Sequence, residues 1–165
     1  MVLLGNLLSL FGCLMMVAIG LVKKKEKILA YQCVQFTFMG LGNLALGAVS
    51  GTVANLVGIV RNLVFAKTKG DFWLKVLFIA IQVGFTAAGW NGQAIEGLPI
   101  VATVLFVAFL DTGSDLIFKL VNMGCMVMWA TYDMHYRNYV AFVCDILTIV
   151  SSAIALAGLM KKKEA

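Results

Sequence analysis

Charged residues are scarce in this sequence. Only 13% of its 165 residues are Asp, Glu, Lys or Arg, whereas 62% are hydrophobic. Soluble domains are about half apolar and about a quarter charged, and a domain of this size still exposes much of its surface to its solvent. The surplus of apolar side chains therefore has no core large enough to hold it. The composition predicts an all-α integral membrane protein.

The sequence also lacks the patterns of disulfide frameworks, metal sites and catalytic centres. Its 4 cysteines lie inside apolar runs and form no Cys-x-x-Cys pair, so we interpret them as small buried side chains. The single histidine, His135, lies in the segment 132–137, which we expect to be an exposed loop. No Ser/His or paired-aspartate arrangement has a spacing that could bring two catalytic groups together. We therefore predict no metal, no cofactor and no enzymatic activity.

The 13 basic residues outnumber the 8 acidic ones, but they do not form a nucleic-acid-binding face. Such a face would interleave basic and aromatic side chains. Here most lysines gather at the ends of apolar runs, at positions 23–27, 67–69 and 161–163. Clusters of this kind set the orientation of a membrane protein, because they stay on the cytoplasmic side.

Runs of roughly 20 apolar residues, with about 17 as a lower limit, can cross the hydrocarbon as helices. Counting such runs predicts seven spans, with six as the alternative; the region 97–130 is too long for one span and is interrupted by Asp111–Asp115. An outside N-terminus and a cytoplasmic C-terminus place the lysines inside, as expected for a bacterial inner membrane protein. The predicted spans are Met1–Val22, Ile28–Gly47, Val49–Ala66, Phe72–Trp90, Ala94–Leu110, Leu116–Ala130 and Asn138–Met160.

Polar residues of the first three spans match those of the last three at an offset of 90 residues. Asn43 then corresponds to Asp133, and Asn55 to Asp145. This predicts two parallel three-helix repeats, residues 1–66 and 94–165, joined by a linker helix within 67–93. Parallel repeats are a known transporter architecture with the substrate site near the bilayer midplane.

Asp145 is the most costly of the polar residues within the spans. A carboxylate at mid-bilayer costs about 2.5–3.5 kcal/mol, so Asp145 must be neutral, hydrated or balanced by a cation. We expect it to line a solvated pathway together with Asn55 and Asn122. Gln35 is a further candidate, although for Gln32, Gln35 and Gln82 taken singly we favour interhelical hydrogen bonds, of about 0.6 kcal/mol each.

Arg61 lies near the inner end of its predicted span. It either extends its side chain to the cytoplasmic interface or pairs with Asp111 as an inner gate.

Three short motifs resemble the YgjV family of bacterial inner membrane proteins: Leu98-Pro-Ile-Val-Ala-Thr103, Trp129-Ala-Thr-Tyr-Asp133 and Asn55-Leu-Val-Gly-Ile-Val-Arg-Asn62. That family is similar in layout to SWEET sugar facilitators and PnuC vitamin-precursor transporters, which share a three-one-three helix plan. The resemblance implies that Asn55 and Asp145 flank the substrate and that Trp129 stacks on it. SWEET-like proteins have hinge prolines in several spans, whereas this chain has Pro99 only.

Three functions compete on this reading. The leading hypothesis is a facilitator or carrier of a small polar solute, such as a sugar, nucleoside or vitamin precursor. The second is a membrane scaffold or subunit in which the polar residues only join helices, and an intramembrane enzyme is third. The expected partners are the lipid bilayer and the solute, with no nucleic acid; a homo-oligomer is compatible with this layout.

Overall fold

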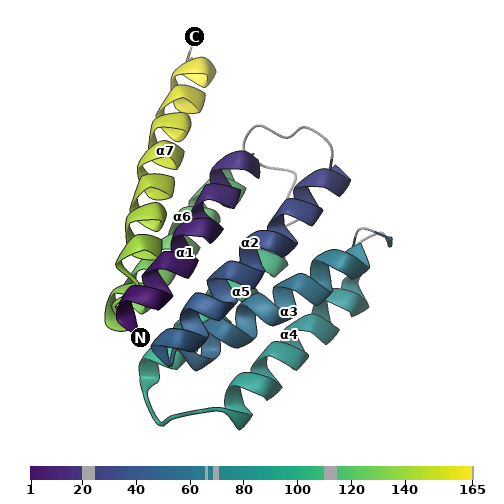
Figure 1. Ribbon diagram of the computed structural model, residues 1–165. Helices are drawn as coiled ribbons and strands as arrows, with labels where there is room; N and C mark the ends of the chain where they lie inside the picture. The colour runs from purple at the N-terminus through teal and green to yellow at the C-terminus, as the bar shows by residue number, and fades with distance from the viewer. Residues whose placement is uncertain (20–24, 66, 69–70, 110–114, 165) are drawn as a thin grey trace.

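In the computed structural model the chain is a bundle of α-helices (Figure 1). The structure describes residues 1–19, 25–65, 67–68, 71–109 and 115–164, and in these ranges it contains seven α-helices, one short 3₁₀ helix and no strand. The elements are α1 (Val2–Ile19), α2 (Lys25–Leu46), α3 (Val49–Phe65), α4 (Phe72–Ala88), η1 (Ala94–Glu96), α5 (Gly97–Phe109), α6 (Asp115–His135) and α7 (Tyr139–Glu164). The all-α prediction is confirmed.

The predicted helices match the observed ones apart from their ends, and α6 differs most. It continues to His135, five residues beyond the predicted end at Ala130, so the prediction of an exposed loop over 132–137 was wrong for its first four residues. Tyr132 and Asp133 are buried rather than looped out, because Tyr132 meets the start of α3 and Asp133 accepts a hydrogen bond from Asn138 in the following turn. His135 is exposed, and its Nε2 lies 2.9 Å from Oε1 of Gln93.

Helices that follow one another in sequence pack as antiparallel neighbours (Figure 1). The closest packing joins α1 to α2 and α2 to α3 in the first half of the chain, and α5 to α6 and α6 to α7 in the second. The N-terminus, the α2–α3 turn and the α6–α7 turn lie at one end of the bundle, opposite the C-terminus. The two halves meet where α1 packs on α7 and α3 on α5.

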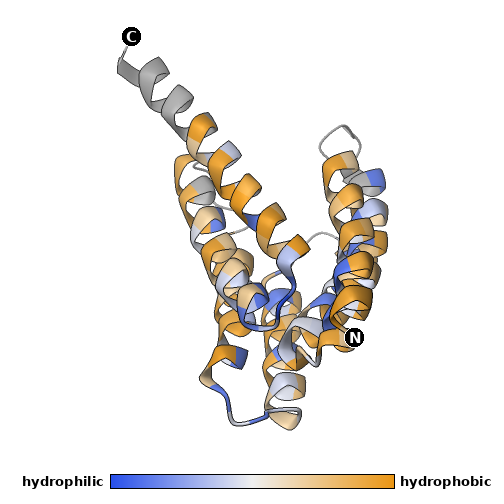
Figure 2. Cartoon of the chain, turned by 60° about the vertical axis from the view of Figure 1, so that its left-hand side comes forward, coloured by the Kyte–Doolittle hydropathy of each residue, from blue (hydrophilic) through white to orange (hydrophobic). Residues whose placement is uncertain are grey.

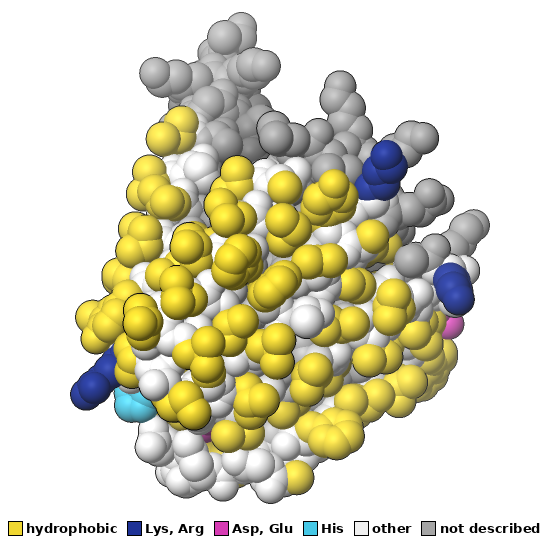
Figure 3. All heavy atoms as spheres, viewed as in Figure 1, with side chains coloured by type: hydrophobic (Ala, Val, Ile, Leu, Met, Phe, Trp, Pro, Cys, Tyr) yellow, Lys and Arg dark blue, Asp and Glu magenta, His cyan; other side chains and the backbone are white. Residues whose placement is uncertain are grey.

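The surface of the bundle is apolar and much of its interior is polar. Hydrophobic side chains cover the visible face, and orange segments run along most of every helix (Figures 2 and 3). On α1 the exposed side chains recur every three or four residues, at Leu3, Leu7, Leu10, Leu14 and Val17. Buried polar side chains include Asn43, Asn62, Gln82, Thr86 and Asn138.

Exposed apolar patches of this extent mark a contact with a membrane or another protein. Measured by length and apolarity together, none of the helices in the described part of the chain reaches the threshold for a membrane span.

The α2–α3 and α6–α7 turns have the same backbone geometry. Gly47 and Arg137 both have a positive φ, of 74° and 59°. In each turn the following residue donates its N–H to a carbonyl five residues back, Ala48 to Asn43 at 2.9 Å and Asn138 to Asp133 at 2.8 Å. This is the Schellman type of helix ending. It occurs twice, at positions 90 residues apart.

The hydrogen bonds that begin α3 and α7 are related in the same way. Asn6 of the first half accepts from the backbone N–H of Val140 in the second half, at 3.0 Å. Glu96 of the second half accepts from the backbone N–H of Ser50 in the first, at 2.7 Å. Both donors and both acceptors are 90 residues apart in sequence. Each half of the bundle therefore caps a helix of the other half at equivalent positions.

Candidate solute-binding site

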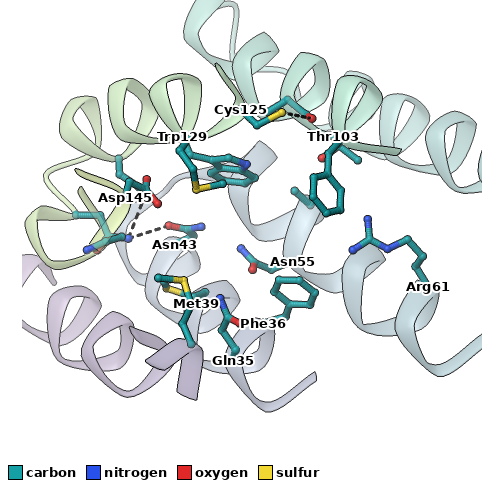
Figure 4. Close-up of a pocket in the computed structure, with 18 residues that line it drawn as sticks. Gln35, Phe36, Met39, Asn43, Asn55, Arg61, Thr103, Cys125, Trp129 and Asp145 are labelled. Atoms are coloured by element: carbon teal, nitrogen blue, oxygen red, sulfur yellow. Dashed lines mark hydrogen bonds between the residues drawn. The ribbon is translucent and has the colours of Figure 1, made fainter. Parts of the chain in front are cut away.

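A cavity of about 190 Å³ lies between the two halves of the bundle (Figure 4). At about 30 Å³ per water molecule, it could hold about six waters. Six helices contribute side chains, and α4 contributes none among the described residues. The lining consists of Met16, Gln35, Phe36, Met39, Asn43, Ala54, Asn55, Arg61, Ala102, Thr103, Phe106, Cys125, Met126, Trp129, Asp133, Asn138, Ala141 and Asp145.

The cavity brings together most of the site residues predicted from the sequence. Asn55 and Asp145 line it from α3 and α7, and Gln35, Trp129 and Arg61 line it as well. Asn122 is not among the lining residues and lies one helical turn before Cys125 and Met126, which do line the cavity, so the cavity gives its inclusion in the site no support. Asp111, the predicted partner of Arg61, lies outside the described residues.

Asn55 and Asp145 lie at equal depth, because each is the seventh residue of its helix. Helical rise places both about 9 Å from the first residue of the helix. Nδ2 of Asn55 donates to the carbonyl of Gly51 one turn earlier, at 2.8 Å. This bond holds the amide against α3, beside the cavity.

One end of the cavity is acidic. Asp133 and Asp145 are close enough for their carboxyl groups to interact, and they are only 4% and 9% exposed. Nδ2 of Asn138 donates to Oδ1 of Asp133 at 3.3 Å and to Oδ1 of Asn43 at 3.1 Å. Oδ2 of Asp145 is buried and receives no hydrogen bond from an N–H group or hydroxyl of the described residues. Its only potential donor among them is the neighbouring Asp133 carboxyl when that group is protonated. A buried polar atom of this kind costs free energy unless a ligand or water meets it.

Arg61 marks the other end of the cavity. Its side chain extends towards Asn55 from the side opposite Asp145 (Figure 4). Among the described residues no carboxylate forms an ion pair with it. The structure therefore gives Arg61 a position on the cavity wall, and the Arg61–Asp111 gate stays a prediction.

Apolar side chains form the wall between these two ends. Phe36 and Met39 come from α2, Phe106 from α5, and Met126 and Trp129 from α6. The indole of Trp129 packs edge-on against Tyr132, with ring centroids 5.9 Å apart. This contact orients the ring within the wall, and the stacking of Trp129 on a solute stays a prediction.

Several other buried polar residues join helices and do not face the cavity. Nδ2 of Asn62 donates to Oε1 of Gln32 at 3.0 Å, between α3 and α2. Nε2 of Gln82 donates to Oγ1 of Thr103 at 3.0 Å and to the carbonyl of Pro99 at 3.2 Å, between α4 and α5. For Gln32 and Gln82 the interpretation as interhelical hydrogen bonds was therefore correct.

Glu96 is a buried polar residue that the sequence analysis missed. It is 1% exposed and accepts hydrogen bonds from the backbone N–H of Ser50 and from the hydroxyls of Tyr136 and Tyr132. The first-turn N–H groups of a helix lack intrahelical partners and favour an anion, and the Ser50 N–H is one of them. The only sequence signal was that Glu96 is the one acidic residue between 89 and 99.

The protonation of Glu96 reflects two opposing effects. Burial alone raises the pKa of its carboxyl, but hydrogen bonds from Ser50, Tyr136 and Tyr132 outweigh burial and hold the pKa below its ordinary value. Burial and the Glu96 carboxylate together raise the pKa of Tyr136 to about 12. Glu96 is therefore a carboxylate and Tyr136 a neutral donor at neutral pH.

The described residues contain no group of three His, Cys, Asp or Glu side chains that could hold a metal ion. The cavity instead offers opposite charges, amide groups and one indole ring. Such a lining can bind a small solute by hydrogen bonds and charge and can orient it against an aromatic surface.

Comparison with protein families assigns the chain to one of them. Residues 3–163 match the family Imp-YgjV, described as bacterial inner membrane protein. The match covers nearly the whole chain, so the protein belongs to this family of bacterial inner membrane proteins. No curated protein and no solved structure matches the sequence significantly. Contact with the lipid bilayer follows from the family and explains the apolar surface of the bundle.

Proposed function

We propose that the protein crosses the inner membrane seven times and carries a small polar solute through the cavity between its two three-helix halves. The observation that carries the proposal is the cavity itself: a polar-ended chamber lined from both halves, with Asn55 and Asp145 at equal depth. Transporters built from parallel repeats bind their substrates at such an interface and alternate access by moving one half against the other. The three-one-three plan of SWEET and PnuC proteins is the layout proposed for this chain.

The distribution of charge supports an outside N-terminus. Lys27 lies in the first turn of α2 and Lys67 lies just after the end of α3. Both side chains are exposed, at the end of the bundle that holds the C-terminus. Asn6, Glu96 and the two Schellman turns lie at the opposite end. Lysines at one end are typical of the cytoplasmic side, so the Glu96 end faces the periplasm. The acidic end of the cavity then lies nearer the periplasm and Arg61 nearer the cytoplasm.

The second candidate, a membrane scaffold, is favoured by the polar contacts that join helices, such as Asn62–Gln32 and Gln82–Thr103. It leaves the unpartnered Oδ2 of Asp145 without a role. A buried acceptor without a partner costs about 1–3 kcal/mol, and packing alone gives no reason to keep it. Transport supplies that reason.

Uptake into liposomes tests the proposal. Purified protein should accumulate at least one solute from a panel of sugars, nucleosides, vitamin precursors and amino acids above protein-free liposomes. Asp145→Asn should fold as well as the parent or better, because the unpartnered carboxylate is gone, and should lose most of the uptake. Asn122→Ala, outside the cavity, should leave uptake unchanged. No uptake of any solute would support the scaffold instead. Unchanged uptake by Asp145→Asn with a lower unfolding temperature would show that Asp145 is structural and does not belong to the transport site.

A further inference from the structure

The two ends of the cavity carry ionisable groups of opposite kind, with carboxyl groups at one end and a guanidinium at the other. Asp133 and Asp145 line one end, and Oδ2 of Asp145, in a side chain only 9% exposed, lacks a hydrogen-bond partner. Arg61 lines the other end, on the far side of Asn55 (Figure 4). Two opposite charges that do not neutralise each other in a low-dielectric interior are costly. A bound solute could neutralise both if its own two charges were at its two ends.

The wall between the charged ends is not suited to a sugar. Apart from the amides of Gln35 and Asn55, the hydroxyl of Thr103 and the thiol of Cys125, the middle of the cavity is lined by methionine, phenylalanine, alanine and the indole of Trp129. A sugar ring would bury several hydroxyl groups against these side chains, and each unpaired hydroxyl carries a desolvation cost. A chain of methylene groups would meet them favourably.

The separation of the charged ends sets the length of such a chain. Arg61 follows Asn55 by six residues, so its Cα lies about 9 Å further along α3. Asp145 lies at the depth of Asn55 on α7. The guanidinium reaches back towards Asn55 over part of this distance. A solute whose ammonium and carboxylate groups are separated by several methylene groups can span such a separation.

We propose that the cavity is specific for an unbranched ω-amino acid, with its ammonium group at Asp133 and Asp145, its methylene chain beside Met39 and Trp129, and its carboxylate at Arg61. This deepens the proposed function, since it names the solute that the site would carry. Arg61 recognises the planar carboxylate through paired N–H groups, and the two aspartates provide acceptors for the ammonium protons.

Binding to the purified parent protein in detergent tests this without any variant. Isothermal titration calorimetry would compare 5-aminopentanoate with pentanoate, which lacks the ammonium, with pentylamine, which lacks the carboxylate, and with glucose. We expect 5-aminopentanoate to bind about tenfold or more tightly than each of the other three, because only it fills both charged ends. Equal or tighter binding of glucose, or of either singly charged compound, would overturn the assignment.

Two variants test which end binds which group. Asp145→Asn should lower the affinity for 5-aminopentanoate to that for pentanoate, and Arg61→Gln should lower it to that for pentylamine. Asn122→Ala, on α6 outside the cavity, should bind like the parent. Unchanged affinity in folded Asp145→Asn and Arg61→Gln proteins would overturn the placement of the solute. If either variant fails to fold, the relative affinities of the parent protein for the four compounds test the proposal by themselves.

Uptake into liposomes separates this inference from the proposed function. Accumulation of 5-aminopentanoate would support both. Accumulation of a sugar or nucleoside without 5-aminopentanoate would support transport and overturn the solute assignment. Tight binding of 5-aminopentanoate without its accumulation would support the binding site and contradict transport.

Discussion

Buried polar side chains have two roles in this protein, and their partners distinguish them. Gln82, Asn62 and Glu96 are satisfied by groups on other helices, so they join the bundle. Among the described residues, buried oxygens of Ser9, Thr86 and Asp145 lack a hydrogen-bond donor, and of these three residues only Asp145 lines the cavity. An unsatisfied buried polar atom costs free energy, and a ligand that binds to this atom explains its presence better than packing does.

Glu96 should be important for stability, and its contribution should depend on pH. Glu96→Gln replaces a carboxylate acceptor of several hydrogen bonds with an amide that matches only some of them, which should cost about 1–3 kcal/mol in the free energy of unfolding. The unfolding temperature in detergent, followed by tryptophan fluorescence, should therefore fall at neutral pH.

The pH dependence follows from the sign of the pKa shift. Because the pKa of Glu96 is lowered in the folded state, its contribution is present at neutral pH and is lost as the pH falls through that lowered value. The gap in unfolding temperature between the parent and Glu96→Gln should therefore narrow under acidic conditions. Asp71→Asn is the matched control, since Asp71 is an exposed N-cap where asparagine serves equally well. A gap that widens in acid would contradict the assignment.

Sequence patterns predicted some of these residues and missed others for a physical reason. Four of the site residues are conspicuous in the sequence: Asp145, Asn55, Arg61 and Trp129. Burying a polar side chain inside an apolar run costs free energy, and an indole ring near the end of such a run favours the membrane interface. Glu96 lies in a connecting segment, where an acidic residue is ordinary, and only the three-dimensional contact with the start of α3 reveals its role. Asn122 has the same sequence signal as Asn55 but is not among the residues that line the cavity.

At the scale of the elements, the apolar runs predicted the helices and the polar residues near their ends obscured the boundaries. Tyr132 and Asp133 resemble loop residues, yet α6 continues through them because Ser50, Gly51 and Asn138 supply their partners. The matching turns after α2 and α6 depend on backbone conformation. Gly47 gives that signal in sequence, whereas Arg137 conceals it.

The turns after α2 and α6 predict opposite changes in stability when their left-handed residues are exchanged for alanine and glycine. Gly47 and Arg137 occupy the left-handed region, which costs a residue with a Cβ about 1 kcal/mol. Gly47→Ala should therefore lower the free energy of unfolding by about this amount, and Arg137→Gly should raise it by a similar amount. A Cβ at Gly47 would meet no atom within 4 Å, so no steric contact contributes.

Thermal unfolding of both variants in detergent measures these effects. Gly84→Ala is the control, because Gly84 is exposed within α4 and a Cβ there also meets nothing within 4 Å. That substitution should stabilise slightly, since alanine is the better helix former. Destabilisation by Arg137→Gly would show that the Arg137 side chain contributes more than its backbone strain costs.

At the scale of the whole molecule, the two halves of the chain have matching features at positions 90 residues apart. They share the Schellman turns and the reciprocal capping bonds of Asn6 and Glu96. Figure 4 shows the consequence: the cavity lies where α2 and α3 face α6 and α7. Composition predicted the membrane environment and polar residues within the apolar runs predicted several cavity residues, whereas the shape of the cavity depends on contacts between residues far apart in sequence.

The central claim is that Asn55 lies on a pathway that opens to each side of the membrane in turn. Labelling of single cysteines tests it without knowledge of the solute. In a background with Cys13, Cys33, Cys125 and Cys144 replaced by alanine, Asn55→Cys would be compared with Val57→Cys. Val57 of α3 is buried in a hydrophobic cluster with Phe65 of the same helix and Phe78 of α4, and it does not line the cavity.

A membrane-impermeant maleimide would be added to spheroplasts, which expose the periplasmic face, and to inverted vesicles, which expose the cytoplasmic face. The account predicts that Asn55→Cys reacts from both faces and that Val57→Cys reacts from neither. Reaction of Asn55→Cys from only one face, or from neither, would contradict a pathway with alternating access through this cavity.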